Sequence, residues 1–179
     1  MHMVIYAIVY AENEYQAMRQ ARKVFRSLCG EKRPFDYYTT FDEDGSQTSG
    51  KGRWGDLTPV ARASSEEGKR YIEQAMKSTR DEFQRNLDEV KQSIASYSDE
   101  QLFEREDMVD GVGGLFRWRC SRLGADEGPV VWLYDHEAEG VKDSRILKAI
   151  LEKWSEFHQG EKNPYEDLEV WVVPADVHY

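Results

Sequence analysis

The residues most suited to recognising a ligand are aromatic, and they lie on two apolar segments, residues 3–11 and 130–136. In each segment they recur at every second position, so on extended strands they would point to one side of a sheet. A third segment, residues 115–123, adds arginines at the same spacing, which could contact phosphate groups. We therefore define a candidate binding face with these members: Tyr6, Tyr10, Trp132, Tyr134, His136, Arg117 and Arg119.

A candidate face of this composition suits three kinds of function. RNA-recognition modules stack bases on aromatic side chains of two central strands, and small-molecule pockets are lined by similar groups. An open apolar sheet face would expose a large patch, which soluble monomers rarely show, so covering by a helix or by a second subunit is the favoured interpretation. The formal net charge of −10 opposes nucleic-acid binding unless a local basic patch overrides it.

The glycine-rich stretch GSQTSGKG, residues 45–52, approaches the phosphate-binding pattern GxxxxGK[ST]. In that pattern a hydroxyl after the lysine holds magnesium, and a helix N-terminus faces the phosphates. Here Gly52 occupies the hydroxyl position, and the residues after it do not predict a helix. We therefore interpret residues 50–55 as an exposed loop anchored by Trp54, and not as a nucleotide site.

The acidic run at residues 42–46 resembles the start of a calcium-binding loop. Such a loop requires glycine at its sixth position and a bidentate glutamate at its twelfth. Counted from Asp42, those positions hold Gln47 and Arg53, so an acidic turn is the favoured interpretation.

Two histidine–carboxylate pairs, Asp135-His136 and Asp176-Val177-His178, could together form a metal or acid–base site. The strands before them are predicted to run in opposite directions, so the pairs fall at opposite edges of the sheet. Cys29 and Cys120 match no metal spacing and are expected to be reduced and buried. We therefore expect no metal and no cofactor, and the sequence contains no pattern that assigns a catalytic residue.

Hydrophobic periodicity predicts the elements that position these residues, beginning with residues 3–11. This stretch is apolar on both faces, which is typical of an interior strand. Asn13 and Gln16 predict a capping box for the following helix, and Gly30 ends that helix. Its apolar stripe consists of Ala17, Met18, Ala21, Val24, Phe25 and Leu28.

Residues 31–110 are predicted to form an insertion of loop, one strand at 35–41 and a long helix at 65–96. At 1.5 Å per residue that helix would be roughly 45 Å long. Ser98 and Gln101 predict a second capping box after it. The narrow apolar stripe on this charged helix suits packing along one neighbour or in a helix pair. The stripe consists of Ile72, Met76, Thr79, Phe83, Leu87, Val90 and Ile94.

The C-terminal part supplies three further strands and one helix. Alternation predicts a strand at residues 115–123, and residues 130–134 predict an interior strand beside the first one. Asp143 caps the last helix, and residues 168–173 form a closing strand that Pro174 ends. The stripe predicted for the last helix consists of Ile146, Leu147, Ile150, Leu151, Trp154 and Phe157.

Without the insertion, the predicted order is strand, helix, strand, strand, helix, strand, which is the ferredoxin-like order βαββαβ. We therefore predict an α+β fold with a ferredoxin-like core. Residues 1–179 would form a single domain, and the mainly helical insertion at 31–110 would lie between the first helix and the second core strand.

Four stretches connect the chain to a known family. They are FDYYTTFDEDG (35–45), RWGDL (53–57), DEFQRNL (81–87) and VVPADVHY (172–179). Through them the chain resembles an uncharacterised family of small acidic proteins from halophilic archaea, over most of its length. The resemblance implies an archaeal source, and it brings no assigned activity.

The chain of 179 residues is 40% hydrophobic, which indicates a globular protein. No apolar run reaches the roughly 18–20 residues that span a bilayer, and no signal peptide is apparent, so we expect a cytoplasmic protein. We expect a non-enzymatic interaction, structural or accessory protein, cellular or viral, that is homo-oligomeric through the candidate binding face or the long helix. Alternatives are a small-molecule enzyme or binder with a pocket at that face, and a single-stranded nucleic-acid binding module.

Overall fold

The computed structural model describes residues 1–44, 46–103, 111–124, 130–153 and 162–179. The chain divides into two compact units. The sheet unit comprises residues 1–76 and 131–179, and the helical unit comprises residues 77–130. The assignment of residues 1–179 to one domain with an insertion at 31–110 stays a prediction.

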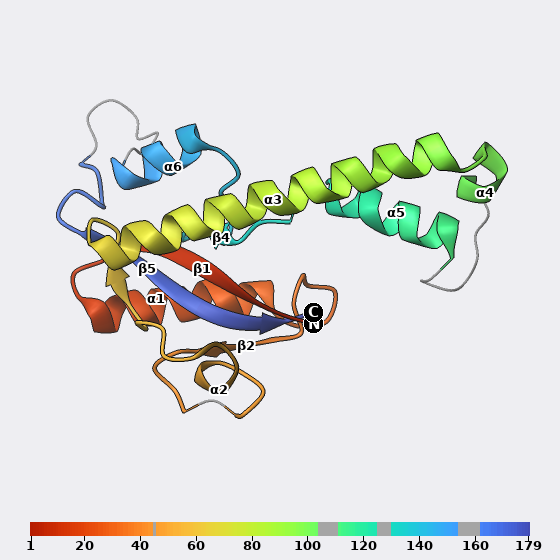
Figure 1. The fold of residues 1–179 in the computed structure, drawn as a ribbon. Coiled ribbons are helices and arrows are strands. Elements are labelled where there is room, and N and C mark those ends of the chain that lie inside the picture. Colours follow the sequence, from red (N-terminus) through yellow and green to blue (C-terminus); the bar gives the residue numbers. More distant parts are fainter. Residues whose placement is uncertain (45, 104–110, 125–129, 154–161) are drawn as a thin grey trace. The chain divides into compact units, whose positions relative to one another are not determined.

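The sheet unit is built on one mixed five-stranded sheet (Figure 1). Its strands are β1 (His2–Ala11), β2 (Tyr37–Thr40), β3 (Ala61–Arg62), β4 (Leu133–Tyr134) and β5 (Glu169–His178). The strand order is β2-β5-β1-β4, and β3 also pairs with β5. β1 runs parallel to β4 and antiparallel to β5, and β2 and β3 are antiparallel to β5.

β1 is an interior strand, as its sequence predicts. It lies between β5 and β4, and every residue from Ile5 to Ala11 is buried. Alternation gives the strand two faces, each part of a separate hydrophobic core. The Ala7 face consists of Ile5, Ala7 and Val9, and the Tyr6 face consists of Tyr6, Ile8 and Tyr10.

β5 does not end at Pro174 but continues to His178, which corrects the predicted boundary. Pro174 lies opposite Tyr6, whose amide donates to Trp132 of the β4 segment and so points away from β5. The Tyr6–Pro174 pair therefore needs no hydrogen bond from Pro174. The amide hydrogen that proline lacks would face the outer side of β5, where β2 has already ended at Thr40.

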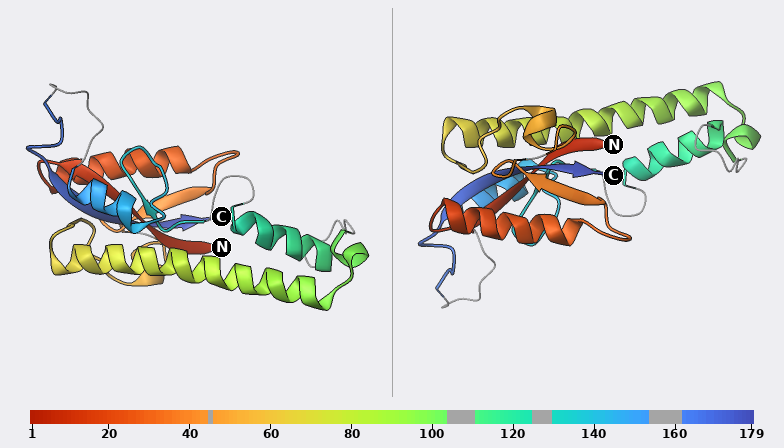
Figure 2. Two further views of the ribbon diagram at one scale, coloured as in Figure 1. Left: turned by 90° about the horizontal axis from the view of Figure 1, so that it is seen from above. Right: turned by 90° about the horizontal axis from the view of Figure 1, so that it is seen from below.

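Helices cover both sides of the sheet (Figure 2). α1 (Glu14–Leu28) packs on the Ala7 face through the buried stripe that the sequence predicts. The first part of α3 (Glu66–Ser96) and α6 (Ser144–Leu151) pack on the Tyr6 face through Ile72 and Ile150, among others. The sheet is therefore enclosed on both sides within its own unit.

Side chains cap these helices where the sequence predicts. The Asn13 side chain accepts from the Gln16 amide at 3.0 Å, and Gly30 follows α1 with a φ of +125°. Asp143 accepts from two backbone amides in the first turn of α6. Only Ile150 of the stripe predicted for α6 is buried, and Trp154 and Phe157 of that stripe lie outside the described residues.

Residues 31–63 contain the predicted strand, β2, and two elements that were not predicted. β3 is one of them, and α2 (Lys51–Trp54), a single helical turn, is the other. The interpretation of residues 50–55 as an irregular loop anchored by Trp54 is therefore wrong. Trp54 is 41% exposed and belongs to neither hydrophobic core.

α3 has the predicted boundaries, with Ser65 accepting from the Gly68 amide at its start. Its predicted apolar stripe is buried at Ile72, Thr79 and Val90 but not throughout, since Phe83 and Ile94 are 38% and 60% exposed. In the helical unit the buried residues of α3 are instead mostly polar. They are Thr79, Glu82, Asn86, Val90 and Ser93.

The helical unit also contains α4 (Asp99–Phe103), with the predicted Ser98–Gln101 capping box, and α5 (Val112–Arg122). α5 replaces the strand predicted at residues 115–123. Arg119 and Arg122, three residues apart, lie on one side of a helix but on opposite sides of a strand. The helix lets both guanidinium groups reach carboxylates of α3, and this pairing overrides the alternating pattern.

The fold is therefore α+β, with one mixed sheet. β4 lies beside β1 as predicted, although it covers only the end of the predicted 130–134 strand. Because residues 115–123 form a helix, the ferredoxin-like order is not confirmed. Within the described ranges, no helix is both long enough and apolar enough to cross a membrane.

Gly68 tests how closely α3 packs on the strand before it. A Cβ atom there would lie 2.0 Å from the Arg62 carbonyl oxygen. We expect Gly68→Ala to lower the free energy of unfolding by about 1–3 kcal/mol, although alanine favours helices, because backbone must move to relieve the overlap. Urea denaturation measures the change, with the exposed Gln74→Ala of the same helix as control. A more stable Gly68→Ala variant would contradict the packing.

Candidate functional site

The candidate binding face does not form one open surface, and Tyr6 shows why. Its side chain is 2% exposed and lies under α3, with the Tyr6 and Tyr71 ring centroids 5.2 Å apart. The Tyr71 hydroxyl donates to the Thr58 carbonyl oxygen at 3.0 Å. Burial raises the pKa of Tyr6 to about 12 and raises that of Tyr71 as well. Both phenols are therefore neutral and enclosed at physiological pH.

Tyr10 is buried at the other end of the Tyr6 face. Its hydroxyl donates to the Ile150 carbonyl oxygen at 3.0 Å, and its ring stacks on Tyr165 at 4.3 Å. The His136 ring meets the Tyr10 ring edge-on at 5.0 Å, and its Nε2 atom lies 3.0 Å from the Tyr165 hydroxyl. Burial raises the pKa of Tyr10 to about 12. The three rings pack on one another, so Tyr10 is enclosed and cannot present its ring face to a base.

Tyr134 lies on the opposite side of the sheet, which corrects its placement with Tyr6 and Tyr10. In the parallel pairing of β1 and β4, Tyr6 faces Leu133 and Ala7 faces Tyr134. Tyr134 therefore belongs to the core of the Ala7 face, whereas Leu133 occupies the position expected for an aromatic residue. Trp132 is half-buried and contacts both cores.

Arg117 and Arg119 belong to the helical unit, while the aromatic members belong to the sheet unit. Arg117 donates to the backbone of residues 102 and 103, and Arg119 pairs with Glu89 at 2.5 Å. Both guanidinium groups therefore already have acceptors inside their own unit.

A cavity of about 540 Å³ lies elsewhere in the sheet unit, and no member of the candidate binding face is among the residues that line it. Its lining includes the apolar side chains of Ile72, Leu151 and Val170, and charged side chains of both signs such as Arg62 and Glu169. Arg62 and Glu169 pair with each other at 2.7 Å. The cavity has the size of a small-molecule site but lacks a convergent set of polar groups.

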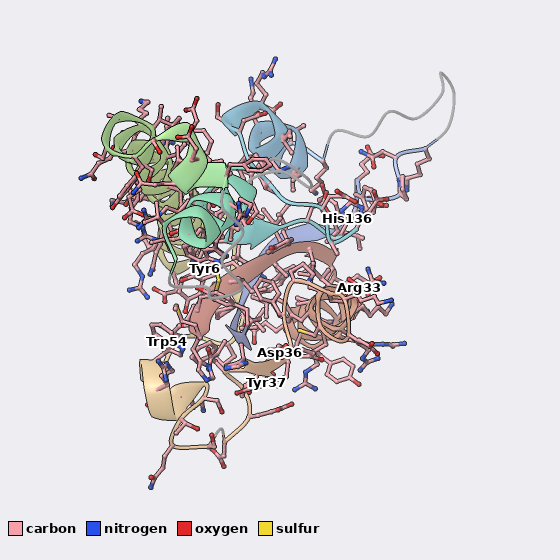
Figure 3. The ribbon with its side chains drawn as sticks, turned by 90° about the vertical axis from the view of Figure 1, so that its right-hand side faces the viewer. Tyr6, Arg33, Asp36, Tyr37, Trp54 and His136 are labelled. Atoms are coloured by element: carbon pink, nitrogen blue, oxygen red, sulfur yellow. The ribbon has the colours of Figure 1, made fainter. Side chains whose placement is uncertain are left out.

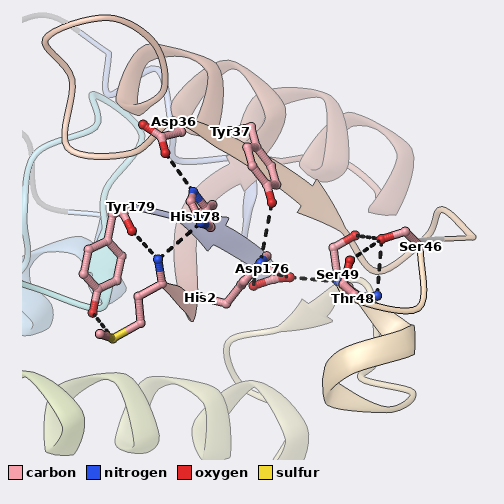
Figure 4. A network of polar contacts seen from close by, with 11 residues as sticks. His2, Asp36, Tyr37, Ser46, Thr48, Ser49, Asp176, His178 and Tyr179 are labelled. Atoms are coloured by element: carbon pink, nitrogen blue, oxygen red, sulfur yellow. Dashed lines mark hydrogen bonds and ion pairs between the residues drawn. The ribbon is translucent and has the colours of Figure 1, made fainter.

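A polar network joins the ends of β1 and β5 (Figure 4). The Asp176 side chain is 0% exposed, and both its oxygens lie 3.1 Å from the His2 Nδ1 atom. The Gly50 amide donates to the same carboxylate at 2.9 Å. Gly50 is the glycine before Lys51 in the stretch that resembles a phosphate-binding loop. A buried carboxylate therefore occupies the place that a phosphate would need.

Gly52, which replaces the hydroxyl residue of the nucleotide pattern, has a packing role. A Cβ atom there would lie 2.3 Å from the Ser46 carbonyl oxygen, so only glycine fits. α2 does begin where a phosphate-binding helix would begin, which the sequence analysis did not expect. Since α2 is only one turn long and its preceding amide is bound to Asp176, the nucleotide interpretation is not favoured.

The second half of the network is more exposed. His178 Nδ1 lies 2.7 Å from the Asp36 carboxylate, and the His178 ring stacks on Tyr37 at 5.1 Å. The Tyr37 hydroxyl is 3.5 Å from His2 Nε2. Figure 3 shows Asp36 and Tyr37 well away from His136. The two histidine–carboxylate pairs of the sequence analysis thus lie at opposite ends of β1, as predicted.

Each histidine in this network is oriented by a carboxylate through Nδ1, as in acid–base and metal sites. In the part of the chain that the structure describes, no three His, Cys, Asp or Glu side chains are grouped to hold a metal ion. Asp42 and Glu43 of the calcium-like run bind Arg22. The network is best understood as a clamp that ties β1, β2 and the residue 46–50 loop to β5.

Sequence reasoning missed His2, Asp36 and Tyr37. The register of β1 with β5 pairs His2 with His178, and β2 adds Tyr37 to the same row. This register depends on contacts more than 130 residues apart in the chain. The only local sequence pattern that pointed to this network was the spacing of Asp176-Val177-His178.

The helical unit has an unusual distribution of side chains. Glu82 is buried and pairs with Arg122 at 2.9 Å, and the Asn86 side chain donates to Glu82. Among the described residues of this unit, Val90 is the only large apolar side chain that is buried. The large apolar side chains exposed in this unit are Phe83, Ile94, Tyr97, Phe103 and Trp118. Most of the large apolar side chains named here therefore face solvent and are not packed between the helices.

Comparison with known proteins gives one match. A family model described as a domain of unknown function, DUF7995, matches residues 1–179. No curated protein matches the chain. No solved structure matches it either.

Asp176 is the residue on which the polar network depends most. We expect Asp176→Ala to lower the free energy of unfolding by roughly 1–3 kcal/mol, because the Gly50 amide and His2 lose their buried acceptor. Asp36→Ala removes the exposed carboxylate that pairs with His178, and it should lower the free energy of unfolding by less than about 1 kcal/mol. Urea denaturation of both variants tests the difference, and equal losses would contradict a buried clamp at Asp176.

The raised pKa of Tyr6 predicts a stability change at high pH. An unfolded tyrosine ionises near pH ~10, whereas folded Tyr6 has a pKa of about 12. The stabilisation is therefore complete below pH ~10 and is lost as pH rises through about 12. Urea denaturation at a series of pH values measures the free energy of unfolding. Between pH ~10 and about 12 this free energy should fall less steeply in Tyr6→Phe than in the parent chain. The exposed Tyr15→Phe is the control, and a slope identical to that of the parent would refute the assignment.

Proposed function

The chain belongs to the DUF7995 family, a domain of unknown function, and we propose that it is a non-enzymatic interaction protein that associates with a second copy of itself. The surface we assign to this contact is the outward side of the helical unit. The observation that carries the proposal is the placement of large apolar side chains outside a helix pair whose inside is polar.

Exposed apolar area of this kind normally marks an interaction surface. Phe103 is 86% exposed and Ile94 is 60% exposed, and neither contributes to either hydrophobic core. Within the described part of the helical unit, α3 and α5 bury one large apolar side chain, Val90, so this pair gains little stability from burial. Contact with a partner would remove the outward apolar side chains from water and stabilise the helix pair.

The spacing on α3 suits a helical partner. Phe83, Leu87 and Ile94 are separated by four and seven residues, so they lie along one side of the helix. This side is next to the polar side formed by Glu82 and Asn86, which faces α5. Apolar residues at such intervals pack into an adjacent helix.

Charge favours a second copy as the occupant. Residues 77–96 carry four basic and four acidic side chains, although the whole chain has a net charge of −10. Two copies can therefore approach each other along this segment without the repulsion that the rest of the acidic chain would cause.

The other surfaces considered from the sequence are less well supported. The Tyr6 face is covered by α3, Ile150 and Tyr165, so it offers no free area for a subunit or for stacked bases. Arg119 and Arg122 are paired with Glu89 and Glu82, which disfavours phosphate binding on α5.

Substitution of the outward apolar side chains tests the proposal. We expect Phe83→Asp and Ile94→Asp each to weaken self-association roughly tenfold or more, because an ionised carboxylate would be buried in an apolar contact. Sedimentation velocity over a concentration series measures the association. Gln92→Asp adds the same charge at an exposed position of the same helix and should change it little. A parent chain that is monomeric at all concentrations would refute the proposal.

A further inference from the structure

α1 and the turn after it carry the opposite charge to the rest of the chain. Residues 14–33 contain six basic side chains and two acidic side chains, a net charge of +4 within a chain of net charge −10. A negative total charge opposes nucleic-acid binding unless a local basic patch overrides it. This segment is such a patch.

The basic side chains of α1 lie on its outward side. Tyr15, Arg19, Arg22 and Arg26 follow each other at intervals of four, three and four residues, which places them along one side of the helix. The opposite side carries the buried stripe that packs on the Ala7 face. Packing of the sheet unit therefore directs these side chains into solvent.

The charges on this side are only partly compensated. Arg22 binds Asp42 at 2.9 Å and Glu43 at 2.5 Å. Arg19, Lys23 and Arg26 form no hydrogen bond or ion pair with other residues that the structure describes. Three cationic groups within two turns of helix thus have no carboxylate partner in the described part of the chain, which is unusual where acidic residues are in excess.

An exposed aromatic ring continues the row of charges. Tyr15 is 78% exposed, more than any other large hydrophobic side chain that the structure describes apart from Phe103. Together with Met18, Asp42 and the four basic side chains, it lines a surface hollow of about 470 Å³. An exposed ring beside a row of cations is the arrangement by which proteins bind single strands, with the base stacked and the phosphates neutralised.

We propose that the outward side of α1 binds single-stranded nucleic acid. Arg19, Lys23 and Arg26 contact successive phosphates, and Tyr15 stacks on an unpaired base. A duplex offers no exposed base face to Tyr15, and an acidic peptide needs no aromatic platform, so a single strand accounts for both features. This surface belongs to the sheet unit and is independent of the self-association surface on the helical unit.

Binding of this kind depends on salt in a way that can be calculated. A single strand that neutralises three side chains gives a slope of log K against log salt of about −2, since the slope is roughly −0.7 per phosphate. The carboxylates of Asp42 and Glu43, which face Arg22, limit that side chain's contribution. The contact is therefore expected to be weak, with a dissociation constant on the order of 10⁻⁵ M at low salt.

Fluorescence anisotropy with labelled 20-nucleotide oligo-dT and oligo-U, on the full chain, tests the proposal. The triple variant Arg19→Glu, Lys23→Glu, Arg26→Glu should weaken binding more than tenfold. Its control is Lys142→Glu, Arg145→Glu, Lys148→Glu, which changes the net charge equally at exposed positions in and beside α6. The control should lose much less affinity, and circular dichroism should show both variants folded.

Tyr15→Ala separates stacking from charge. It should weaken single-strand binding roughly fivefold or more while leaving the salt slope unchanged. Equal losses in the two triple variants would overturn the proposal in favour of a general charge effect. Tighter binding of duplex or of poly-glutamate than of single strands would also overturn it, as would no binding to either oligonucleotide at low salt.

Discussion

The antiparallel pairing of β1 with β5 is the contact on which the sheet unit depends. It extends over ten residue pairs, from His2 with His178 to Ala11 with Glu169. β5 then provides the outer edge to which β2 and β3 attach, and β1 provides the edge for β4. The two hydrophobic cores lie on opposite sides of this pair. Because every residue of β1 pairs with a residue of β5 that is distant in the sequence, the core forms only when distant parts of the chain meet.

The two units are stabilised in different ways. The sheet unit buries large apolar side chains on both sides of β1. The helical unit buries Glu82 and Asn86 between its helices, and Glu89 and Glu82 of α3 form ion pairs with Arg119 and Arg122. Buried ion pairs add little net stability, since the loss of hydration offsets most of the attraction. Such pairs do select one alignment of α3 with α5, which places the apolar residues on the outer surface.

Local sequence signals predicted the elements whose stability is local. Asn13, Asp143 and the α1 stripe were placed correctly, since capping and amphipathicity act within a few residues. Prediction failed where a distant partner decides the structure. Residues 115–123 alternate like a strand but form a helix because carboxylates of α3 bind Arg119 and Arg122. The register that places Tyr134 away from Tyr6, and His2 beside Asp176, also depends on distant pairing.

Pro174 also affects how the sheet edge interacts with other chains. On the outer side of β5, β2 pairs as far as Ala175 and β3 begins pairing at Val172, so Pro174 lies in the gap between them. An open strand edge at such a gap would offer donors and acceptors to a foreign strand. Proline has no amide hydrogen, so an incoming strand cannot accept a hydrogen bond from β5 at this position. The residue that first suggested the end of a strand thus protects the sheet against aggregation through that gap.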